Sequence, residues 1–283
     1  MKKKIFKIIA TVLILVIVFF ISLPTLLNKA GLHPDYNSKK YSFSDKKAVI
    51  ISTSHSILSK PGETTGKLTG VFASELTVPY YEFTDSGIEV DIASIKGGEI
   101  PIDPESFFYV VKTSSDDRYL EDPILKEKVE NSILIDELEM DNYDIVFIAG
   151  GWGAAYDLGY SETLGEKMSQ AYYNPNSVIG GVCHGVLGFI NAKDSLGNLI
   201  IKNKRMTGVT DKQIKELGID FTPQHPEKEL IKAGVIFESK TALRDVFANL
   251  TIVDDESKFV SGQNQNAGHE TPQKMMEILK NKR

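Results

Sequence analysis

The segment SVIGGVCHG, residues 177–185, joins a short β-branched run to two glycines and then to Cys183, the one cysteine of the chain. Its last five residues have the form of the G-x-S-x-G nucleophile elbow, with cysteine in the place of serine. Glycines flank such a nucleophile because the sharp turn from strand to helix holds it in a strained backbone conformation. The segment therefore predicts a buried parallel strand at residues 177–179, followed by a glycine turn that holds a nucleophile at the carboxyl edge of a sheet.

Cys183 is the residue for which the sequence predicts covalent chemistry. At the start of a helix, the helix dipole and the free N–H groups favour the thiolate over the thiol. A buried core cysteine is the competing interpretation, and the flanking glycines and the strand–turn–helix context favour the nucleophile. A single cysteine also excludes an intramolecular disulfide and a thiolate-rich metal site. The five histidines are scattered along the chain, so no metal site or cofactor is predicted.

Strand-like and helix-like patterns alternate along the rest of the chain. Residues 47–53, 88–95 and 145–149 have the short apolar or alternating patterns of strands, and residues 161–172 have the pattern of a helix. A helix is also compatible with residues 70–83, where Pro79 would bend it. The other expected elements are strands at 204–207, 250–253 and 258–261 and helices at 123–129 and 271–280. This alternation predicts an α/β fold with a mostly parallel sheet that helices cover on both faces.

The first 30 residues are predicted to lie outside this fold as a membrane anchor. Four lysines, at positions 2, 3, 4 and 7, precede an apolar run over residues 8–27, about as long as the ~20 residues that cross a bilayer. A cleaved signal peptide is the alternative, and the length of the run and the lack of a small-x-small site before Asn28 disfavour it. We therefore expect a single-pass transmembrane helix in the cell membrane, with the lysines on the cytoplasmic side and the remainder outside.

Two further segments complete the predicted organisation. Residues 31–45 are polar and contain Gly31 and Pro34, which is typical of a tether. Residues 46–283 have the length of one α/β domain. The formal net charge of −6 provides no basic surface, so the sequence predicts no nucleic-acid partner.

A second glycine-rich turn is expected at the same edge of the sheet. Gly150-Gly151-Trp152-Gly153 follows the strand at residues 145–149, and its backbone N–H groups, from Gly151 and Trp152, could form an oxyanion hole with the His184 amide. A simple glycine-rich turn is equally consistent with these residues. The position favours the site, because ligands bind outside the carboxyl ends of parallel strands.

These motifs together resemble a known group of proteins. The strand-GG-x-G turn, the Cys-His elbow and Val260-Ser261-Gly262-Gln263-Asn264 are similar to the PfpI-type peptidases and glutathione-independent glyoxalases of the class I glutamine amidotransferase-like superfamily. Residues 204–210 and 223–230 resemble segments of its heat-shock chaperone–glyoxalase branch. The resemblance covers residues 46–280 and implies a flavodoxin-like, doubly wound sandwich with cofactor-free chemistry.

The resemblance also implies a partner for the cysteine. In these families a glutamate on the first helix contacts the elbow cysteine, and the matching position here is Glu75. By itself, a lone glutamate in a helical stretch would be read as a solvated surface charge. Glu75 is therefore expected as an acid/base only because of the resemblance, with Cys183 as nucleophile and His184 as the third catalytic residue.

One expected residue is missing from the pattern. The family branch often has an acidic residue that orients the histidine, and the expected position falls on Gln213 or Ile214. Asp211 or Glu216 could substitute for it. Activity would then depend mainly on Cys183 and Glu75.

A rival constellation is His225-Pro226-Glu227, since glutamine amidotransferases use a histidine and a glutamate two residues apart. At least two strands follow His225, however, and a capping turn before a helix at 226–233 is the favoured interpretation. His225 and Asp211 are retained as candidate pocket residues.

The resemblance implies a glyoxalase III-like enzyme that acts on a small dicarbonyl such as methylglyoxal. In this hypothesis the Cys183 thiolate attacks the aldehyde, and Glu75 moves a proton between adjacent carbons. A peptidase or amidohydrolase acting on a peptide or amide is the first alternative, because an elbow positions a nucleophile and not a substrate. A stress chaperone or redox sensor that uses Cys183 oxidation is the second. The sequence leaves a homodimer open.

Overall fold

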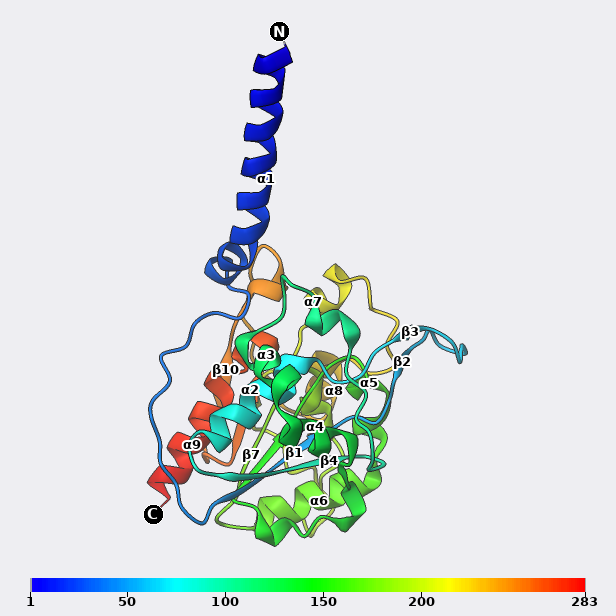
Figure 1. Ribbon diagram of the computed structural model, residues 1–283. Helices are drawn as coiled ribbons and strands as arrows, with labels where there is room; N and C mark the ends of the chain where they lie inside the picture. Colours follow the sequence, from blue (N-terminus) through cyan, green and yellow to red (C-terminus); the bar gives the residue numbers. More distant parts are fainter. Residues whose placement is uncertain (1, 283) are drawn as a thin grey trace.

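A seven-stranded sheet forms the centre of the computed structural model, which describes residues 2–282 (Figure 1). Its strand order is β10-β11-β7-β6-β1-β4-β5, and neighbouring strands are parallel except for β10 and β11. The strands are β1 (Lys47–Ser52), β4 (Glu89–Ser94), β5 (Ile133–Leu134), β6 (Ile145–Ile148), β7 (Val178–Val182), β10 (Thr251–Val253) and β11 (Phe259–Gly262).

Both faces of the sheet are buried. In β1, Ala48 and Ile50 pack into one hydrophobic core, and Val49 and Ile51 pack into the other. This division follows from the twofold alternation of side chains along a strand. A parallel sheet with helices on both faces needs strands that are apolar throughout, which is why continuous apolar runs predicted the central strands.

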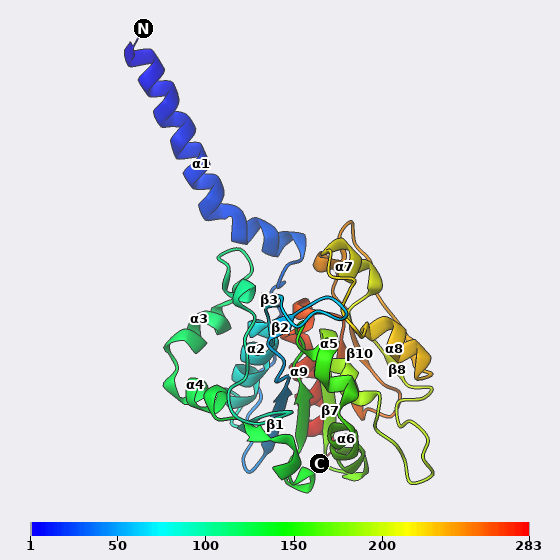
Figure 2. The same cartoon turned by 90° about the vertical axis from the view of Figure 1, so that its right-hand side faces the viewer.

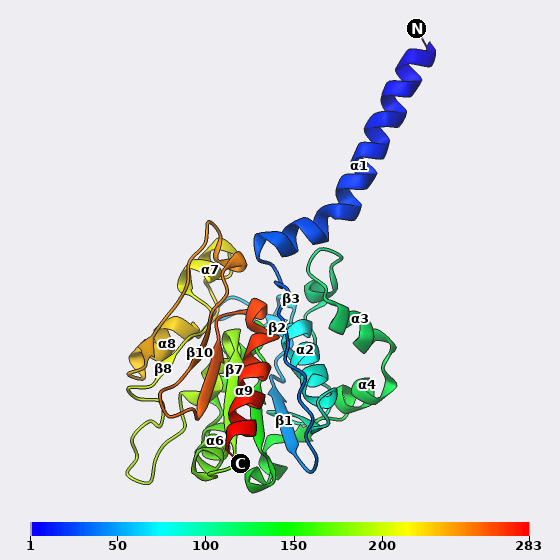
Figure 3. The same ribbon diagram turned by 90° about the vertical axis from the view of Figure 1, so that its left-hand side faces the viewer.

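The helices divide between these two cores. Figure 3 shows α9 and α2 over one face, and Figure 2 shows α5 and α6 over the opposite face. The first core contains residues of α2 (Ala73–Thr84), α3 (Ser114–Glu121), α4 (Pro123–Glu130), α7 (Asp211–Glu216) and α9 (Glu270–Asn281). The second contains residues of α5 (Ala154–Asp157), α6 (Glu162–Tyr173), α8 (Pro226–Lys232) and the 3-10 helix η5 (Cys183–Phe189). This arrangement confirms the predicted doubly wound, mostly parallel fold.

At the carboxyl end of the sheet, two elements have bounds that differ from those expected from the sequence. The strand expected to end at Ile179 continues as β7 to Val182, and Gly180 and Gly181 are buried within it. The helix expected from residue 70 begins only at Ala73, because Val71 still pairs with Ile102 as an isolated parallel bridge. Both shifts place backbone turns at the carboxyl end of the sheet.

Among the other short elements, β8 (Arg205–Met206) falls within the strand expected at residues 204–207 and pairs with β9 (Ile236–Phe237). The remaining short elements had no clear sequence signal. They are β9, β2 (Ile57–Leu58) with β3 (Lys67–Leu68), and the 3-10 helices η1 (Pro104–Phe107), η2 (Ile135–Glu137), η3 (Met140–Asn142), η4 (Leu158–Tyr160), η6 (Asp245–Phe247) and η7 (Gln265–Ala267).

The N-terminal helix α1 (Lys2–Ala30) extends away from the sheet (Figures 1 and 2). Its length and apolar composition over Lys3–Ala30 are sufficient to cross a membrane. It bends in its last third, where Pro24 lies, as expected for a proline within a helix. Residues 34–43, expected to be a tether, have no helix or strand and run along the domain, with the Phe43 N–H donating to the Ser86 carbonyl.

Candidate active site

Cys183 lies at the point where β7 ends and η5 begins. Its φ of 58° is in the left-handed region, which is the strained backbone conformation expected for a nucleophile elbow. Gly185 is required two residues later, because a Cβ there would lie 2.3 Å from the Ile148 carbonyl oxygen at the end of β6. The side chain of Cys183 is almost fully buried, with 7% of its residue surface exposed.

Glu75, in the first turn of α2, faces this cysteine. Its carboxyl lies against the Cys183 thiol and the Gly150 backbone, and its residue surface is 1% exposed. Among the described residues, its Oε2 atom has no partner at hydrogen-bonding distance. Burial raises the pKa of the Glu75 carboxyl to about 8, because an apolar environment disfavours the charged form. Glu75 is therefore largely protonated at neutral pH.

The thiol departs from the sequence-based expectation. Burial, and then the neighbouring Glu75 carboxylate, raise the pKa of the Cys183 thiol well above its usual range. Hydrogen bonds from the backbone N–H groups of His184 and Gly151 lower the pKa of the thiol, but by less than burial and Glu75 raise it. The expected thiolate rested on a helix dipole, whereas the helix that begins here is a 3-10 helix of seven residues. The resting nucleophile is thus a neutral thiol.

His184 contacts the thiol but is not oriented by an acid. Its Nδ1 atom is 3.5 Å from the Cys183 sulfur, and its ring packs against Trp152 with centroids 4.9 Å apart. Burial, and then the charge of His225, lower the pKa of His184 to about 3. Its Nε2 atom is buried without a hydrogen-bond partner among residues 2–282. The ring is therefore a neutral neighbour of the sulfur.

None of the four residues considered for the orienting position bonds to His184 in the described chain. The Gln213 side chain accepts a hydrogen bond from Asn264, and Ile214 lies in the hydrophobic core. The Asp211 carboxylate lies 3.0 Å from Nδ1 of the His225 ring, and the Glu216 carboxylate accepts a hydrogen bond from the Asp245 N–H. The departure from the family pattern is therefore also seen in the geometry.

The remaining predicted residues divide into two groups. Gly151 and Trp152 line the same cavity as Cys183, and the Gly151 N–H is directed at the sulfur together with the His184 N–H. His225 and Asp211 do not line this cavity. They form a pair that joins the start of α7, where Asp211 lies, to the start of α8, where His225 is the N-cap residue. The charge of His225 contributes, after burial, to the lowered pKa of His184.

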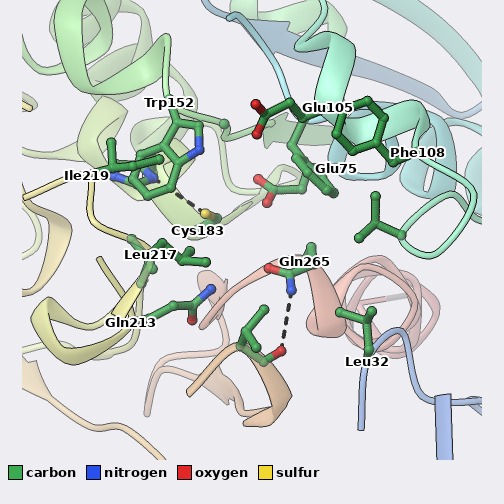
Figure 4. Close-up of a pocket in the computed structure, with 16 residues that line it drawn as sticks. Leu32, Glu75, Glu105, Phe108, Trp152, Cys183, Gln213, Leu217, Ile219 and Gln265 are labelled. Carbon is green, nitrogen blue, oxygen red and sulfur yellow. Dashed lines mark hydrogen bonds between the residues drawn. The ribbon is translucent and has the colours of Figure 1, made fainter. Parts of the chain in front are cut away.

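The cavity around the thiol is mostly apolar and has a volume of about 250 Å³ (Figure 4). Sequence reasoning missed most of its wall, because the wall comes from loops far apart in the chain. Gln213, considered as the orienting position, also lines the cavity, and the missed lining residues are Leu32, Phe72, Glu105, Phe108, Val111, Val209, Leu217, Ile219, Val246 and Gln265. The one local signal was the apolar run at residues 108–111 within a polar, acidic stretch.

The site combines a buried cysteine in a strained backbone conformation with a buried glutamic acid, at the edge of a parallel sheet. The same features underlie the family resemblance described above. A model of the DJ-1/PfpI family matches residues 68–254. The chain belongs to the DJ-1/PfpI family. The match includes Glu75, the glycine-rich turn and the cysteine elbow, so the family resemblance expected from the motifs is confirmed.

Members of the DJ-1/PfpI family with curated names are similar over most of their length. Glyoxalase 3 of Candida albicans is 29% identical over 214 residues, which cover 73% of this chain and 88% of that protein. Glutathione-independent glyoxalase HSP31 of Saccharomyces cerevisiae is 29% identical, with 76% and 92% covered. The named relatives are thus glutathione-independent glyoxalases, which supports enzyme activity of this kind.

Solved structures agree with this family fold. Rapid Encystment Protein 24 kDa of Francisella tularensis aligns with a TM-score of 0.75 and 33% identity, covering 83% of this chain and 99% of that one. Glyoxalase III of Candida albicans aligns with a TM-score of 0.73 at 24% identity, covering 83% and 97%. The second likeness shows the fold alone.

Proposed function

We propose that this DJ-1/PfpI protein is a cofactor-free, cysteine-dependent enzyme that converts a 2-oxoaldehyde into a 2-hydroxy acid. One observation carries the proposal: the Cys183 thiol faces a buried carboxyl, Glu75, whose pKa is about 8. A carboxyl with a pKa near the working pH can both take and return a proton. The names of the curated relatives support the same reaction class.

The first step adds the thiol across the aldehyde. The ionised form of Glu75 takes the proton from the Cys183 thiol as the sulfur bonds to the aldehyde carbon. The N–H groups of Gly151 and His184 stabilise the oxygen anion that forms, and the proton held by Glu75 then neutralises that oxygen. The product is a hemithioacetal, and Glu75 is again a carboxylate.

The second step moves a hydrogen between adjacent carbons. Glu75 removes the hydrogen of the former aldehyde carbon as a proton, and an enediolate forms with its charge on the oxygen of the neighbouring carbon. Glu75 then returns this proton to the neighbouring carbon, and the hydroxyl proton of the former aldehyde carbon moves to the neighbouring oxygen, which gives a thioester of the 2-hydroxy acid. Water hydrolyses the thioester, which releases the acid and restores the thiol. The overall reaction adds one water molecule and needs no external oxidant, reductant or glutathione.

The environment of His184 favours this reaction over peptide hydrolysis. A cysteine peptidase needs an acid that protonates the leaving amine, and a histidine oriented by a carboxylate usually supplies it. Burial lowers the pKa of His184 to about 3, so the ring is not in the imidazolium form that would act as this acid at neutral pH. The proton shuttle in this site is therefore assigned to Glu75.

We also propose that α1 anchors the enzyme in a membrane. Residues 1–30 then form the anchor, residues 31–45 connect it to the domain, and residues 46–283 form the catalytic domain. The length and composition of α1 support this assignment, and the lysine cluster supports a cytoplasmic N-terminus with the catalytic domain outside.

The test uses the full chain in detergent, with methylglyoxal and no glutathione or metal added. Cys183→Ala is expected to abolish lactate formation, because the chain has no other thiol. Glu75→Gln is expected to lower kcat by about 10²–10⁴-fold, the usual contribution of general acid–base catalysis. His184→Ala is expected to have a smaller effect, because this ring is neutral and is not the imidazolium acid at neutral pH.

Glu162→Gln is the matched control, because Glu162 also lies in the first helical turn, of α6, but is exposed. It should leave lactate formation unchanged. A wild-type chain without methylglyoxal turnover, or a Cys183→Ala variant that retains it, would show the assignment to be wrong.

A further inference from the structure

An exposed apolar loop lies beside the cavity. Phe108, Tyr109, Val110 and Val111 follow η1 as an unbroken apolar run, which we name the FYVV loop. Phe108 is 58% exposed and Tyr109 is 60% exposed. Exposing this much apolar surface to water is unfavourable, and contiguous exposed apolar residues commonly mark an interaction site.

This loop connects the cavity with the proposed membrane helix. Phe108 and Val111 line the cavity of Cys183, while the Tyr109 hydroxyl donates to the Ile21 carbonyl oxygen at 3.4 Å. Ile21 lies in the last third of the apolar run of α1, so the loop is near the end of that run that faces the domain. Tyrosine is favoured at this level, because its ring lies in the boundary region and its hydroxyl reaches water.

The residues directly after α1 form another part of the cavity wall. Leu32 is 7% exposed and lines the cavity. Gly31 has a φ of +111°, and a Cβ there would lie 2.6 Å from the Phe247 carbonyl oxygen. The His33 N–H donates to Asn266 at 2.8 Å. The chain is therefore fixed onto the domain within three residues of the end of the helix, so the cavity is held close to the membrane.

The helix α1 and the cavity lie at the same end of the domain. Figure 2 and Figure 3 show α1 leaving the domain at the end where α7 lies, and Gln213 of α7 lines the cavity of Cys183. Figure 4 shows Leu32 and Phe108 on the side of the cavity away from Trp152, with Cys183 and Glu75 between them. An apolar surface thus continues from the proposed bilayer to the nucleophile.

We propose that the site takes amphipathic 2-oxoaldehydes from the bilayer, such as those formed when lipid chains are oxidised. The aldehyde reaches Cys183, and the alkyl chain lies against Leu32, Phe108 and Val111. This inference rests on the proposed function and adds its substrate class. The cavity volume of about 250 Å³, near the lower end of the ~300–1,000 Å³ typical of ligand pockets, leaves space for a chain beyond a three-carbon dicarbonyl.

The first experiment compares methylglyoxal with 2-oxooctanal, using the full chain in phosphatidylcholine nanodiscs. We expect kcat/KM to rise about fourfold for each buried methylene. Phe108→Ser and Leu32→Ala should each reduce the ratio of the two kcat/KM values. Phe108 is exposed, so its replacement leaves the core intact. Leu196→Ser is the matched control, because Leu196 is 85% exposed in a turn outside the cavity, and it should leave the ratio unchanged.

A second experiment measures binding without turnover. Trp152 is the only tryptophan in the sequence, so its fluorescence in detergent micelles reports occupation of the cavity in the Cys183→Ala variant. We expect 2-octanone to change this fluorescence at a concentration at least tenfold lower than acetone does. Phe108→Ser should weaken the binding of 2-octanone, and Leu196→Ser should not.

These outcomes separate the two proposals. Equal kcat/KM values for both aldehydes, or a ratio unaffected by Phe108→Ser and Leu32→Ala, would overturn the inference while the glyoxalase function stands. Absence of turnover with both aldehydes would overturn the proposed function instead. In that case, preferential binding of 2-octanone would still support an alkyl-binding wall in the cavity. Equal binding of both ketones would contradict it.

Discussion

The Cys183–Glu75 pair occupies a geometry that lowers the stability of the folded chain. A non-glycine residue in the left-handed region costs about 1–3 kcal/mol, and Cys183 has a φ of 58°. Glu75 is a buried carboxyl whose Oε2 has no hydrogen-bond partner in the described residues. The same features expose the sulfur to the cavity and bring the carboxyl pKa near neutrality. Stability and reactivity are therefore opposed at these two residues.

This opposition predicts how the stability of Glu75→Gln depends on pH. Burial raises the pKa of Glu75 from 4.5 to about 8 in the folded chain, so the folded state holds a proton that the unfolded state releases between these values. The contribution of Glu75 to stability is present below pH ~4.5 and is lost as the pH rises to ~8. Glu75→Gln, which cannot ionise, should gain stability over the wild type across that window.

The gain should reach a few kcal/mol, at ~1.4 kcal/mol for each pKa unit. Thermal unfolding followed at a series of pH values measures it, with Glu162→Gln as the control that should show no such trend. A difference in Tm between Glu75→Gln and wild type that does not change with pH would contradict the burial of an ionisable Glu75.

At the scale of single residues, the sequence predicted Cys183 for a physical reason. Its flanking glycines are needed where backbone from β6 approaches closely, so the nucleophile leaves a local signature. Glu75 leaves none, because its burial is created by segments distant in the chain, and only the family resemblance pointed to it. The raised thiol pKa was missed for the same reason, since it depends first on the burial of the thiol itself and then on the neighbouring Glu75.

Among the elements, the contact between β6 and η5 positions the nucleophile. Gly185→Ala would place a Cβ 2.3 Å from the Ile148 carbonyl oxygen, which is backbone and cannot rotate away. Overpacking of this kind typically costs about 1–3 kcal/mol, and the shift would also move Cys183. We expect a lower Tm and at least a tenfold loss of kcat for methylglyoxal.

Gly188→Ala provides the graded control, because a Cβ there meets the tips of the Ile148 and Leu164 side chains, which can adjust. Its Tm and kcat should fall less than those of Gly185→Ala. Equal effects of the two substitutions on Tm would mean that the backbone contact has no special role.

The helices and strands that could be predicted from the sequence are those whose burial dominates their composition. The central strands are buried on both faces, so their apolar runs were recognisable in the sequence. The helix α3 was missed because its surface is polar; a capping box between Thr113 and Asp116 begins it. The segment at residues 31–45 was predicted to be a tether from its polarity, and the buried Leu32 and Phe43 within it were not recognised as contacts with the domain.

For the whole molecule, the connection between α1 and the domain sets the geometry of the site. Because Leu32 is part of the cavity wall, removing the first 44 residues would open the cavity as well as remove the proposed anchor. Because residues 31–33 are bound to the domain, the cavity also lies at a fixed distance from the proposed anchor. The proposed anchor and the proposed site therefore act as one unit.

The proposed orientation gives a last prediction, on the side of the membrane that each end occupies. Lysines flanking an apolar helix remain on the cytoplasmic side, so the catalytic domain should lie outside. In the Cys183→Ala background, Leu196→Cys creates an exposed thiol in the domain, and Lys4→Cys creates one at the lysine-rich end. In intact cells, a membrane-impermeant maleimide should label the first variant and label the second only after lysis. Labelling in the reverse pattern would place the catalytic domain in the cytoplasm, because each thiol then reports the opposite compartment.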